Sequence, residues 1–244
     1  MQAMEQMTWR AKVGLITTSG QLITEPRYYQ VAPEGVSFHT TRMLNPPGGG
    51  LEALIEMEKE SWRGVGELAT ARVDSIAYCC TVSGALRGME EDKKFCAEVE
   101  DRHGIPTTST MLAAVEALQH LGAERVAVAT PYTEGHHEAE RAYLREAGIE
   151  PVVIRGMGLT GGEQYSAVSP REIFDFSVES WDDSADALFI SCMNLDGIAA
   201  AQALEERLGK PVITSHTATL WRALALAGVE DPVHGCGQLL EGER

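Results

Sequence analysis

Two cysteines end short apolar runs of the kind that form buried strands. Cys80 ends the run SIAYCC and is followed by Thr-Val-Ser-Gly, and Cys192 ends the run ALFISC and is followed by Met-Asn-Leu-Asp. The thiolate is the reactive form of cysteine, and a helix N-terminus lowers the pKa of a thiol. A strand-to-helix turn offers that environment, so both residues are candidates for chemistry.

Two opposed thiols suit two kinds of reaction. One thiol can remove a proton from a carbon next to a carboxylate while the other returns a proton on the opposite face, which racemises or epimerises that carbon. Alternatively, a thiolate can add to an activated double bond, which rotates as a single bond before elimination gives the other geometric isomer. Neither route needs a metal or an organic cofactor, and we expect none. The alternative is that both cysteines are small buried hydrophobes.

Both reactions place negative charge on a carboxylate oxygen, which needs preorganised hydrogen-bond donors. On one side we expect these donors from Thr81, Ser83 and the amides of the turn 80–84. On the other side we expect them from Met193 and Asn194.

Cys79 is a different case from its neighbour Cys80. Successive side chains of a strand point to opposite faces, so the side chain of Cys79 should point away from that of Cys80. We therefore expect Cys79 to pack in the core.

Short β-rich runs alternate with amphipathic helical patterns along the chain. The expected helices include 51–70, 111–122 and 197–209. The expected strands are 12–18, 75–80, 125–130, 151–156, 187–192 and 210–215. Alternation of this kind predicts an α/β fold with parallel sheets.

The chain also contains an internal repeat. VEDRHGIPTTSTMLAAVEAL matches LEERLGKPVITSHTATLWRAL, and placing Cys80 on Cys192 aligns the preceding strands without a gap. We interpret this as two pseudo-symmetric Rossmann-like domains, 1–115 and 116–225, with a C-terminal segment 226–244 and the last helix free to cross over. Chance likeness between α/β units is the alternative. Because ligands bind beyond the carboxyl ends of parallel strands, the two cysteines should face one cleft between the halves.

The formal net charge of -16 argues against nucleic acid and anionic lipid as partners, because both require a basic face. An anionic substrate would therefore be held by local amides and hydroxyls. No apolar run approaches the ~20 residues of a membrane span, and the start of the chain lacks the pattern of a secretory signal. We expect a cytoplasmic protein whose five cysteines stay reduced.

At these residues the sequence resembles the aspartate/glutamate racemase superfamily, and most of all its maleate cis-trans isomerase and arylmalonate decarboxylase branch. The similar stretches are YCCTVSG, the segment GIPTTSTMLAAVEALQHLGAERVAVATPYTE, LFISCMNLDG and LGKPVITSHTATLWRAL. The resemblance implies a duplicated fold, a site between the halves, a small carboxylate substrate, no cofactor, and a homodimer or larger homo-oligomer.

Residue by residue, the resemblance puts Cys80 and Cys192 in the catalytic cysteine positions. It puts Tyr132 in the place of a carboxylate-binding tyrosine and Thr81 in a carboxylate-binding loop. Decarboxylating members of the family keep only the second cysteine, so the pair favours an isomerase or racemase. The alternatives are an arylmalonate-type decarboxylase with Cys192 as proton donor, and a non-catalytic carboxylate-binding protein.

The chain departs from the family pattern at four further positions that we expect to contact substrate. Gln21 stands in place of an asparagine, and Val82 replaces a serine and removes one hydroxyl donor. His137 and His216 also stand where the family carries asparagine. The pocket should therefore differ in detail from a maleate pocket.

Three other segments are less specific. TEGHHEAE, 133–140, fits a helix start better than a metal site, because adjacent histidines point in different directions on a helix. NPPGGG, 45–50, is a loop that could cover the site, and 156–170 is a loop that could line the mouth of the cleft.

Overall fold

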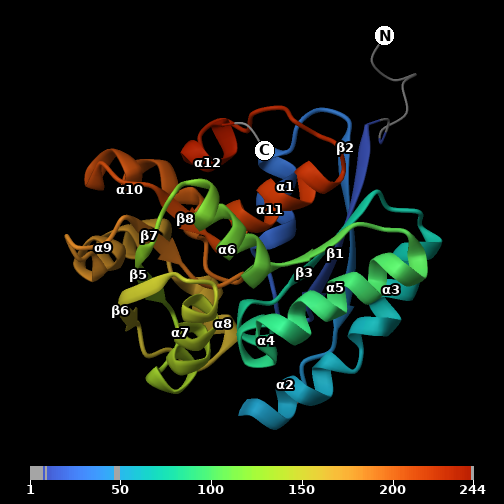
Figure 1. Ribbon diagram of the computed structural model, residues 1–244, viewed down its shortest axis with the longest axis horizontal. Coiled ribbons are helices and arrows are strands. Elements are labelled where there is room, and N and C mark those ends of the chain that lie inside the picture. Colours follow the sequence, from blue (N-terminus) through green and yellow to red (C-terminus); the bar gives the residue numbers. More distant parts are fainter. Residues whose placement is uncertain (1–7, 9, 47–49, 243–244) are drawn as a thin grey trace.

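The computed structural model describes residues 8, 10–46 and 50–242. Its strands form two parallel sheets of four, in the orders β2-β1-β3-β4 and β6-β5-β7-β8 (Figure 1). The strands are β1 (Ala11–Thr18), β2 (Val36–Met43), β3 (Ser75–Cys79), β4 (Thr107–Ser109), β5 (Arg125–Thr130), β6 (Glu150–Gly156), β7 (Ala187–Ile190) and β8 (Val212–Thr214). The predicted α/β class with two parallel sheets is confirmed.

Helices separate the strands and cover both sheets. The α-helices are α1 (Thr24–Val31), α2 (Gly50–Glu58), α3 (Ser61–Thr70), α4 (Thr81–Arg87), α5 (Met89–His103), α6 (Thr110–His120), α7 (His137–Glu146), α8 (Gly162–Ala167), α9 (Pro170–Ser180), α10 (Ala201–Leu208), α11 (Ser215–Leu226) and α12 (Gln238–Glu241). Two short 3-10 helices, η2 (Glu134–His136) and η3 (Gly197–Ala199), precede α7 and α10. Among the described residues, none of the helices has the length and apolar character needed to cross a bilayer.

Three local expectations from the sequence were wrong. The expected helix 197–209 is in fact the short helix η3 and the helix α10, which are separated by a turn at Ala200. The strand β2 was not expected, because VSFHTTRM lies at the edge of its sheet and mixes polar with apolar residues instead of forming a continuous apolar run. The expected helix 51–70 is in fact the two helices α2 and α3, which are separated by a turn at Lys59 and Glu60.

The predicted repeat is visible in matching structural details of the two halves. The helices α5 and α10 both end at a glycine in the left-handed conformation, with φ of 67° at Gly104 and 64° at Gly209. A short strand follows each glycine, and its last residue caps the next helix. Ser109 accepts from the amide of Leu112 at the start of α6, and Thr214 accepts from that of Thr217 in α11.

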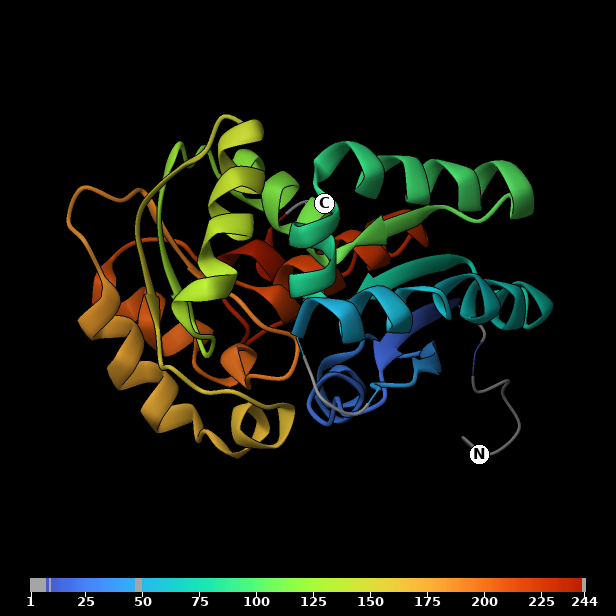
Figure 2. The same ribbon diagram turned by 90° about the horizontal axis from the view of Figure 1, so that it is seen from below.

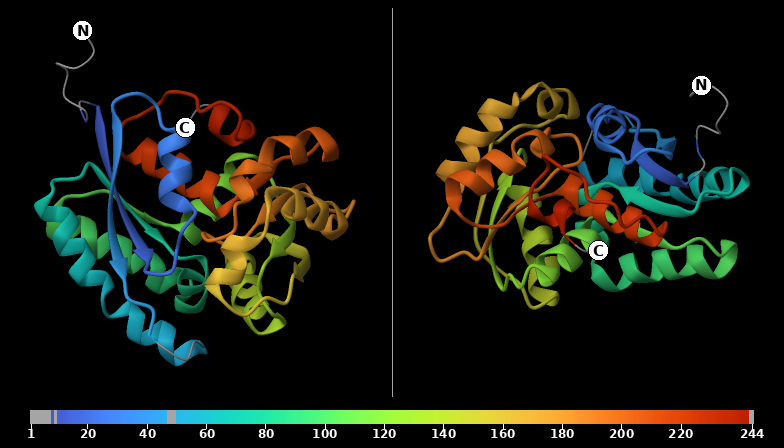
Figure 3. Two further views of the ribbon diagram at one scale, coloured as in Figure 1. Left: turned by 180° about the vertical axis from the view of Figure 1, so that it is seen from behind. Right: turned by 90° about the horizontal axis from the view of Figure 1, so that it is seen from above.

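The last helix of the second half crosses over to the first half, and the last helix of the first half contacts both sheets. The helix α11 follows β8 of the second sheet but packs against β3 and β4 of the first sheet, and α6 follows β4 but contacts β8. The two helices also pack against each other at the centre of the molecule (Figures 2 and 3). The boundary predicted between 115 and 116 falls inside α6, and the division into two domains stays a prediction.

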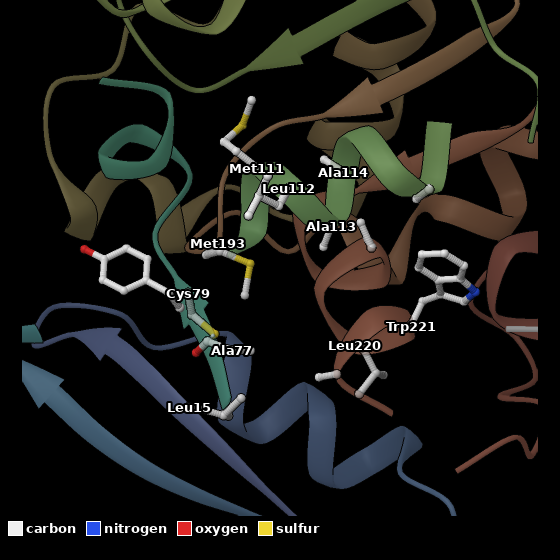
Figure 4. Packing of buried hydrophobic residues seen from close by; sticks show 14 of the residues in the cluster. Leu15, Ala77, Cys79, Met111, Leu112, Ala113, Ala114, Met193, Leu220 and Trp221 are labelled. Carbon is white, nitrogen blue, oxygen red and sulfur yellow. Dashed lines mark hydrogen bonds between the residues drawn. The ribbon is translucent and has the colours of Figure 1, made fainter. Parts of the chain in front are cut away.

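Residues of α6, of α11 and of both sheets belong to one hydrophobic cluster. Figure 4 shows Cys79 and Met193 in the same cluster as Met111 of α6 and Leu220 of α11. Cys79 is completely buried, as expected for a core residue. The same packing fixes the turn that follows Cys79 against the turn that contains Met193.

Candidate active site

A cavity of about 330 Å³ lies beyond the carboxyl ends of the central strands of both sheets. The segments after β1, β2 and β3 of the first half and after β5, β6 and β7 of the second half contribute to its lining, so each half supplies three. Cys80 comes from the loop after β3 and Cys192 from the loop after β7, and both line the cavity. The expectation that the two thiols share one cleft between the halves therefore agrees with the geometry.

The two thiols have different hydrogen-bond partners. Cys80 is the N-cap residue of α4, and its Sγ lies 3.2 Å from Ser83 Oγ. Cys192 sits in a loop, where its Sγ accepts from the backbone N–H of Asn194 at 3.3 Å. The side chain of Cys80 thus faces the first turn of a helix, whereas that of Cys192 is held by a loop amide.

Burial raises the pKa of both thiols, because removal from water disfavours the thiolate. For Cys192 the pKa rises to about 12, although hydrogen bonding from Tyr132 and from the amide of Asn194 lowers it. For Cys80, hydrogen bonding to Ser83 opposes the rise of the pKa. Cys192 therefore holds its proton at neutral pH, and each thiol already has a group that can stabilise its thiolate.

The polar part of the lining consists of hydroxyl, amide and imidazole side chains. None of the lining residues, within the described part of the chain, is Lys, Arg, Asp or Glu. The polar lining residues are Thr18, Gln21, Asn45, Thr81, Tyr132, Thr133, His136, Thr160, Tyr165 and Asn194. An anionic ligand would be held here by hydroxyls and backbone amides, as expected from the negative charge of the chain.

The two predicted amide side chains both line the cavity, but their own hydrogen bonds are largely internal. Gln21 donates from Nε2 to the carbonyl of Cys79 at 2.9 Å, and its Oε1 accepts from Thr24 at 2.8 Å. Asn194 accepts from the amide of Leu22 at 2.8 Å and donates to the carbonyl of Gly162 at 2.7 Å. Both side chains therefore tie the surrounding loops together.

Of the other predicted contact residues, Thr81, Val82, Tyr132 and Met193 also line the cavity. Tyr132 is nearly buried, and its side chain lowers the pKa of the Cys192 thiol, which lines the same cavity. This is the position from which a phenol could donate to a carboxylate held beside that thiol.

Three predicted contact residues, Ser83, His137 and His216, lie outside the lining of the cavity. Ser83 contacts the Cys80 thiol, and His137 Nε2 lies 3.1 Å from Thr130 Oγ1. His216 is completely buried, and its Nε2 lies 3.3 Å from Thr24 Oγ1. Direct contact with substrate stays a prediction for all three.

The sequence reasoning missed His136 and Tyr165, which both line the cavity. Their rings flank Tyr132, with centroid distances of 5.4 Å to His136 and 5.5 Å to Tyr165. The pair of histidines in TEGHHEAE was the available signal, but it is His136 and not His137 that faces the cavity. Its Nδ1 is buried without a hydrogen-bond partner among the described residues.

An apolar wall completes the cavity. Ala53, Leu54 and Met57 of α2 form it together with Pro46 and Leu159. The expected loop 156–170 lines the cavity through residues 159–162 and Tyr165. The expected cover 45–50 contributes Asn45 and Pro46, and its residues 47–49 lie outside the described part of the chain.

Comparison with known proteins finds relatives along almost the whole chain. The family model for arylmalonate decarboxylase matches residues 22–240. Maleate isomerase from Pseudomonas putida is 28% identical over 218 residues, which cover 87% of each chain. Arylmalonate decarboxylase from Bordetella bronchiseptica is 30% identical over 181 residues, which cover 73% of this chain and 74% of the relative.

The fold has close matches among solved structures. A variant of the maleate isomerase from Pseudomonas putida S16, determined with maleate, has a TM-score of 0.88 at 28% identity. The match covers 95% of this chain and 98% of the other. The fold is thus shared over nearly the full length.

Proposed function

The chain belongs to the arylmalonate decarboxylase family, and we propose that within this family it is a cofactor-independent isomerase or racemase of a small carboxylate. The reacting groups in this proposal are Cys80 and Cys192. The observation that carries it is that two thiols, from equivalent places in the repeat, line a single cavity between the halves. A reaction with one thiol would need only one of them.

In a cis-trans isomerisation, the thiolate of Cys80 adds to one carbon of an activated double bond. The electron pair of that bond moves onto the neighbouring carboxylate. Alternatively, it forms a new C–H bond at the other carbon with a proton from Cys192. Rotation about the resulting single bond follows. Return of the electron pair, with return of the proton to Cys192 where one was transferred, then expels the Cys80 thiolate. The assignment of attack to Cys80 comes from the resemblance to maleate isomerases.

In a racemisation the same two sulfurs exchange protons with the substrate. One thiolate accepts the proton from the carbon next to the carboxylate, and the other thiol donates a proton to the opposite face. Thr81 and Tyr132, which both line the cavity, would donate to the carboxylate as its negative charge grows. Both reactions balance without a metal or an organic cofactor.

One observation favours the decarboxylase alternative. Cys192 holds its proton, with a pKa of about 12, as a proton donor to a carbanion must. The apolar wall on α2 would also accept the apolar arm of an arylmalonate-type substrate. In that case Cys80 would be incidental to the reaction.

Separate replacement of the two cysteines tests the proposal. The Cys80→Ala and Cys192→Ala variants are incubated in D2O with a panel of unsaturated dicarboxylates, 2-substituted carboxylates and arylmalonates, and products are followed by NMR. We expect each variant to lose about a thousandfold in kcat/KM. Cys96→Ala is the matched control, because Cys96 is a buried cysteine outside the cavity.

The pattern of losses separates the candidates. Loss only with Cys192→Ala, together with release of CO2, would favour the decarboxylase. Unchanged cellular function with both cysteines replaced would overturn both enzymatic proposals and leave a carboxylate-binding protein.

Assembly as a homodimer or larger and a cytoplasmic location remain predictions. Light scattering of the purified protein tests the first.

A further inference from the structure

We propose that Ser215 is a positioning residue that makes Thr81 a hydrogen-bond donor toward a carboxylate in the cavity. The inference rests on the proposed function, because it assumes that the cavity takes a carboxylate. Ser215 itself does not line the cavity and would act through Thr81.

Ser215 joins the two cysteine-bearing turns. It is the first residue of α11 and is completely buried. Its Oγ accepts from the backbone N–H of Cys192 at 3.0 Å and lies 3.1 Å from Thr81 Oγ1. Thr81, which directly follows Cys80, lines the cavity. The serine of the second half therefore links the backbone of one turn to the hydroxyl of the other.

The direction of the Ser215–Thr81 hydrogen bond follows from the surroundings of the two hydroxyls. Only one hydrogen can lie between them. If Thr81 donated, the hydrogen of Ser215 would be buried with no acceptor, since no other acceptor for it exists among the described residues. An unmade hydrogen bond of a buried group is costly, whereas the hydrogen of Thr81 can point into the cavity. Ser215 is therefore the donor and Thr81 the acceptor.

This direction gives the hydroxyl chain a defined sense. It runs from the Cys192 N–H to Ser215, from Ser215 to Thr81, and from Thr81 into the cavity. An ionised carboxylate only accepts hydrogen bonds, so it is the ligand that completes the chain. Hydrogen bonds in such a chain polarise one another, which strengthens the final donor.

The repeat contains no second chain of this kind. The counterpart of Ser215 in the first half is Thr110, the first residue of α6. Its Oγ1 donates to the carbonyl of Tyr78 at 3.2 Å and accepts from Thr219 at 3.1 Å. The oriented hydroxyl therefore serves only the Cys80 side of the cavity, which makes the two halves of the site unequal.

The test is a double-mutant cycle on carboxylate binding. Binding of malonate and of phenylacetate is measured by calorimetry for the wild type, Ser215→Ala, Thr81→Val and the double variant. We expect Ser215→Ala to weaken binding about tenfold, because the last donor loses its orientation. In the Thr81→Val background the same replacement should have almost no further effect.

Two control variants separate positioning from structural support. Ser215→Thr keeps the hydroxyl, as Thr110 does in the first half, and should bind the carboxylates like the wild type. Thr219→Val removes another buried hydroxyl from the same helix, outside the cavity, and should also leave binding unchanged. If Ser215→Ala fails to fold, Ser215→Cys keeps the volume with only a weak donor, and the same tenfold loss is expected.

The outcomes are distinguishable from failure of the proposed function. If the wild type binds no carboxylate of the panel and converts none, the proposed function is wrong. If the wild type binds but Ser215→Ala binds equally well, or if its effect adds fully to that of Thr81→Val, the role of Ser215 is refuted.

Discussion

Glu140 is a carboxylic acid placed almost out of contact with water beside the candidate site. It is 1% exposed, and its Oε1 accepts from the hydroxyl of Ser191, which directly precedes Cys192. Its Oε2 has no partner among the described residues. Burial raises the pKa of Glu140 to about 7, and its negative charge in turn raises the pKa of Cys192 and of Tyr132.

The other charged side chains around α7 are already paired or turned outward. On the packed helix α4, Arg87 pairs with Glu58 and Asp92. On β6, Arg155 donates to the carbonyl of Glu179 at the exposed surface. The titratable groups that sense Glu140 are therefore Cys192 and Tyr132.

The sign of the effect on stability follows from the raised pKa. The native state binds the Glu140 proton more tightly than the unfolded state does. The free energy of unfolding of the protein therefore falls as the pH rises from about 4.5 to about 7. We expect Glu140→Gln to gain roughly 3 kcal/mol in unfolding free energy, relative to the wild type, between pH 5 and pH 8. Urea unfolding at both pH values measures it, and a parallel pH dependence of the two proteins would contradict it.

Glu140 should also tune the reactivity of Cys192. Above pH 7 its charge disfavours the thiolate, so in a Cys80→Ala background Glu140→Gln should speed alkylation of Cys192 by iodoacetamide several-fold. Below pH 6 the carboxyl is neutral and the two rates should converge. Equal rates at pH 8.5 would show that the two groups are not coupled.

At the scale of elements, the end of β6 passes very close to the loop that carries Tyr132. A Cβ on Gly156 would lie 2.1 Å from the carbonyl oxygen of Tyr132 and 2.8 Å from His137 Nε2. Only glycine fits this approach, because the first of these atoms belongs to the backbone and has no room to move. The strand end thus sets the position of Tyr132 over the cavity.

Replacement of Gly156 should therefore affect both stability and the site. We expect Gly156→Ala to cost about 3 kcal/mol of unfolding free energy and to lower activity through displacement of Tyr132. Gly66→Ala is the control, because nothing lies within 4 Å of its added Cβ in α3, and it should stabilise by up to about 1 kcal/mol. Denaturant unfolding measures the free energy of unfolding of both variants. Equal values for Gly156→Ala and Gly66→Ala would contradict the close approach of β6 to the Tyr132 loop.

The elements that the sequence predicted best are those with a local signal. The central strands β1, β3, β5 and β7 are continuous apolar runs, and the repeat pointed to both cysteines. By contrast, β2 is an edge strand without such a run. The apolar wall on α2 and the faces of His136 and Tyr165 depend on packing between segments distant in sequence, which no local pattern records.

At the scale of the whole molecule, a net charge of -16 surrounds a cavity whose lining contains no Lys, Arg, Asp or Glu in the described part of the chain. The long-range field repels an anionic substrate, and salt screens this repulsion over about 10 Å at 0.1 M. We expect KM for a dicarboxylate to fall about two- to tenfold between 10 and 150 mM salt.

A neutral probe provides the control for this expectation. Alkylation by iodoacetamide should not change with salt, whereas alkylation by the anionic iodoacetate should accelerate. A KM that rises with salt would mean that local attraction, and not the overall charge, governs the approach of the substrate.

The packing of the central helices α6 and α11 limits how a ligand can reach the cavity. Because α11 continues from the second half yet packs on the sheet of the first half, the two halves are interlocked. A rigid-body opening of the two halves would separate α11 from the sheet on which it packs. We therefore expect a ligand to enter and leave through movement of the other lining segments, α2 and residues 159–162, while the two sulfurs stay in place.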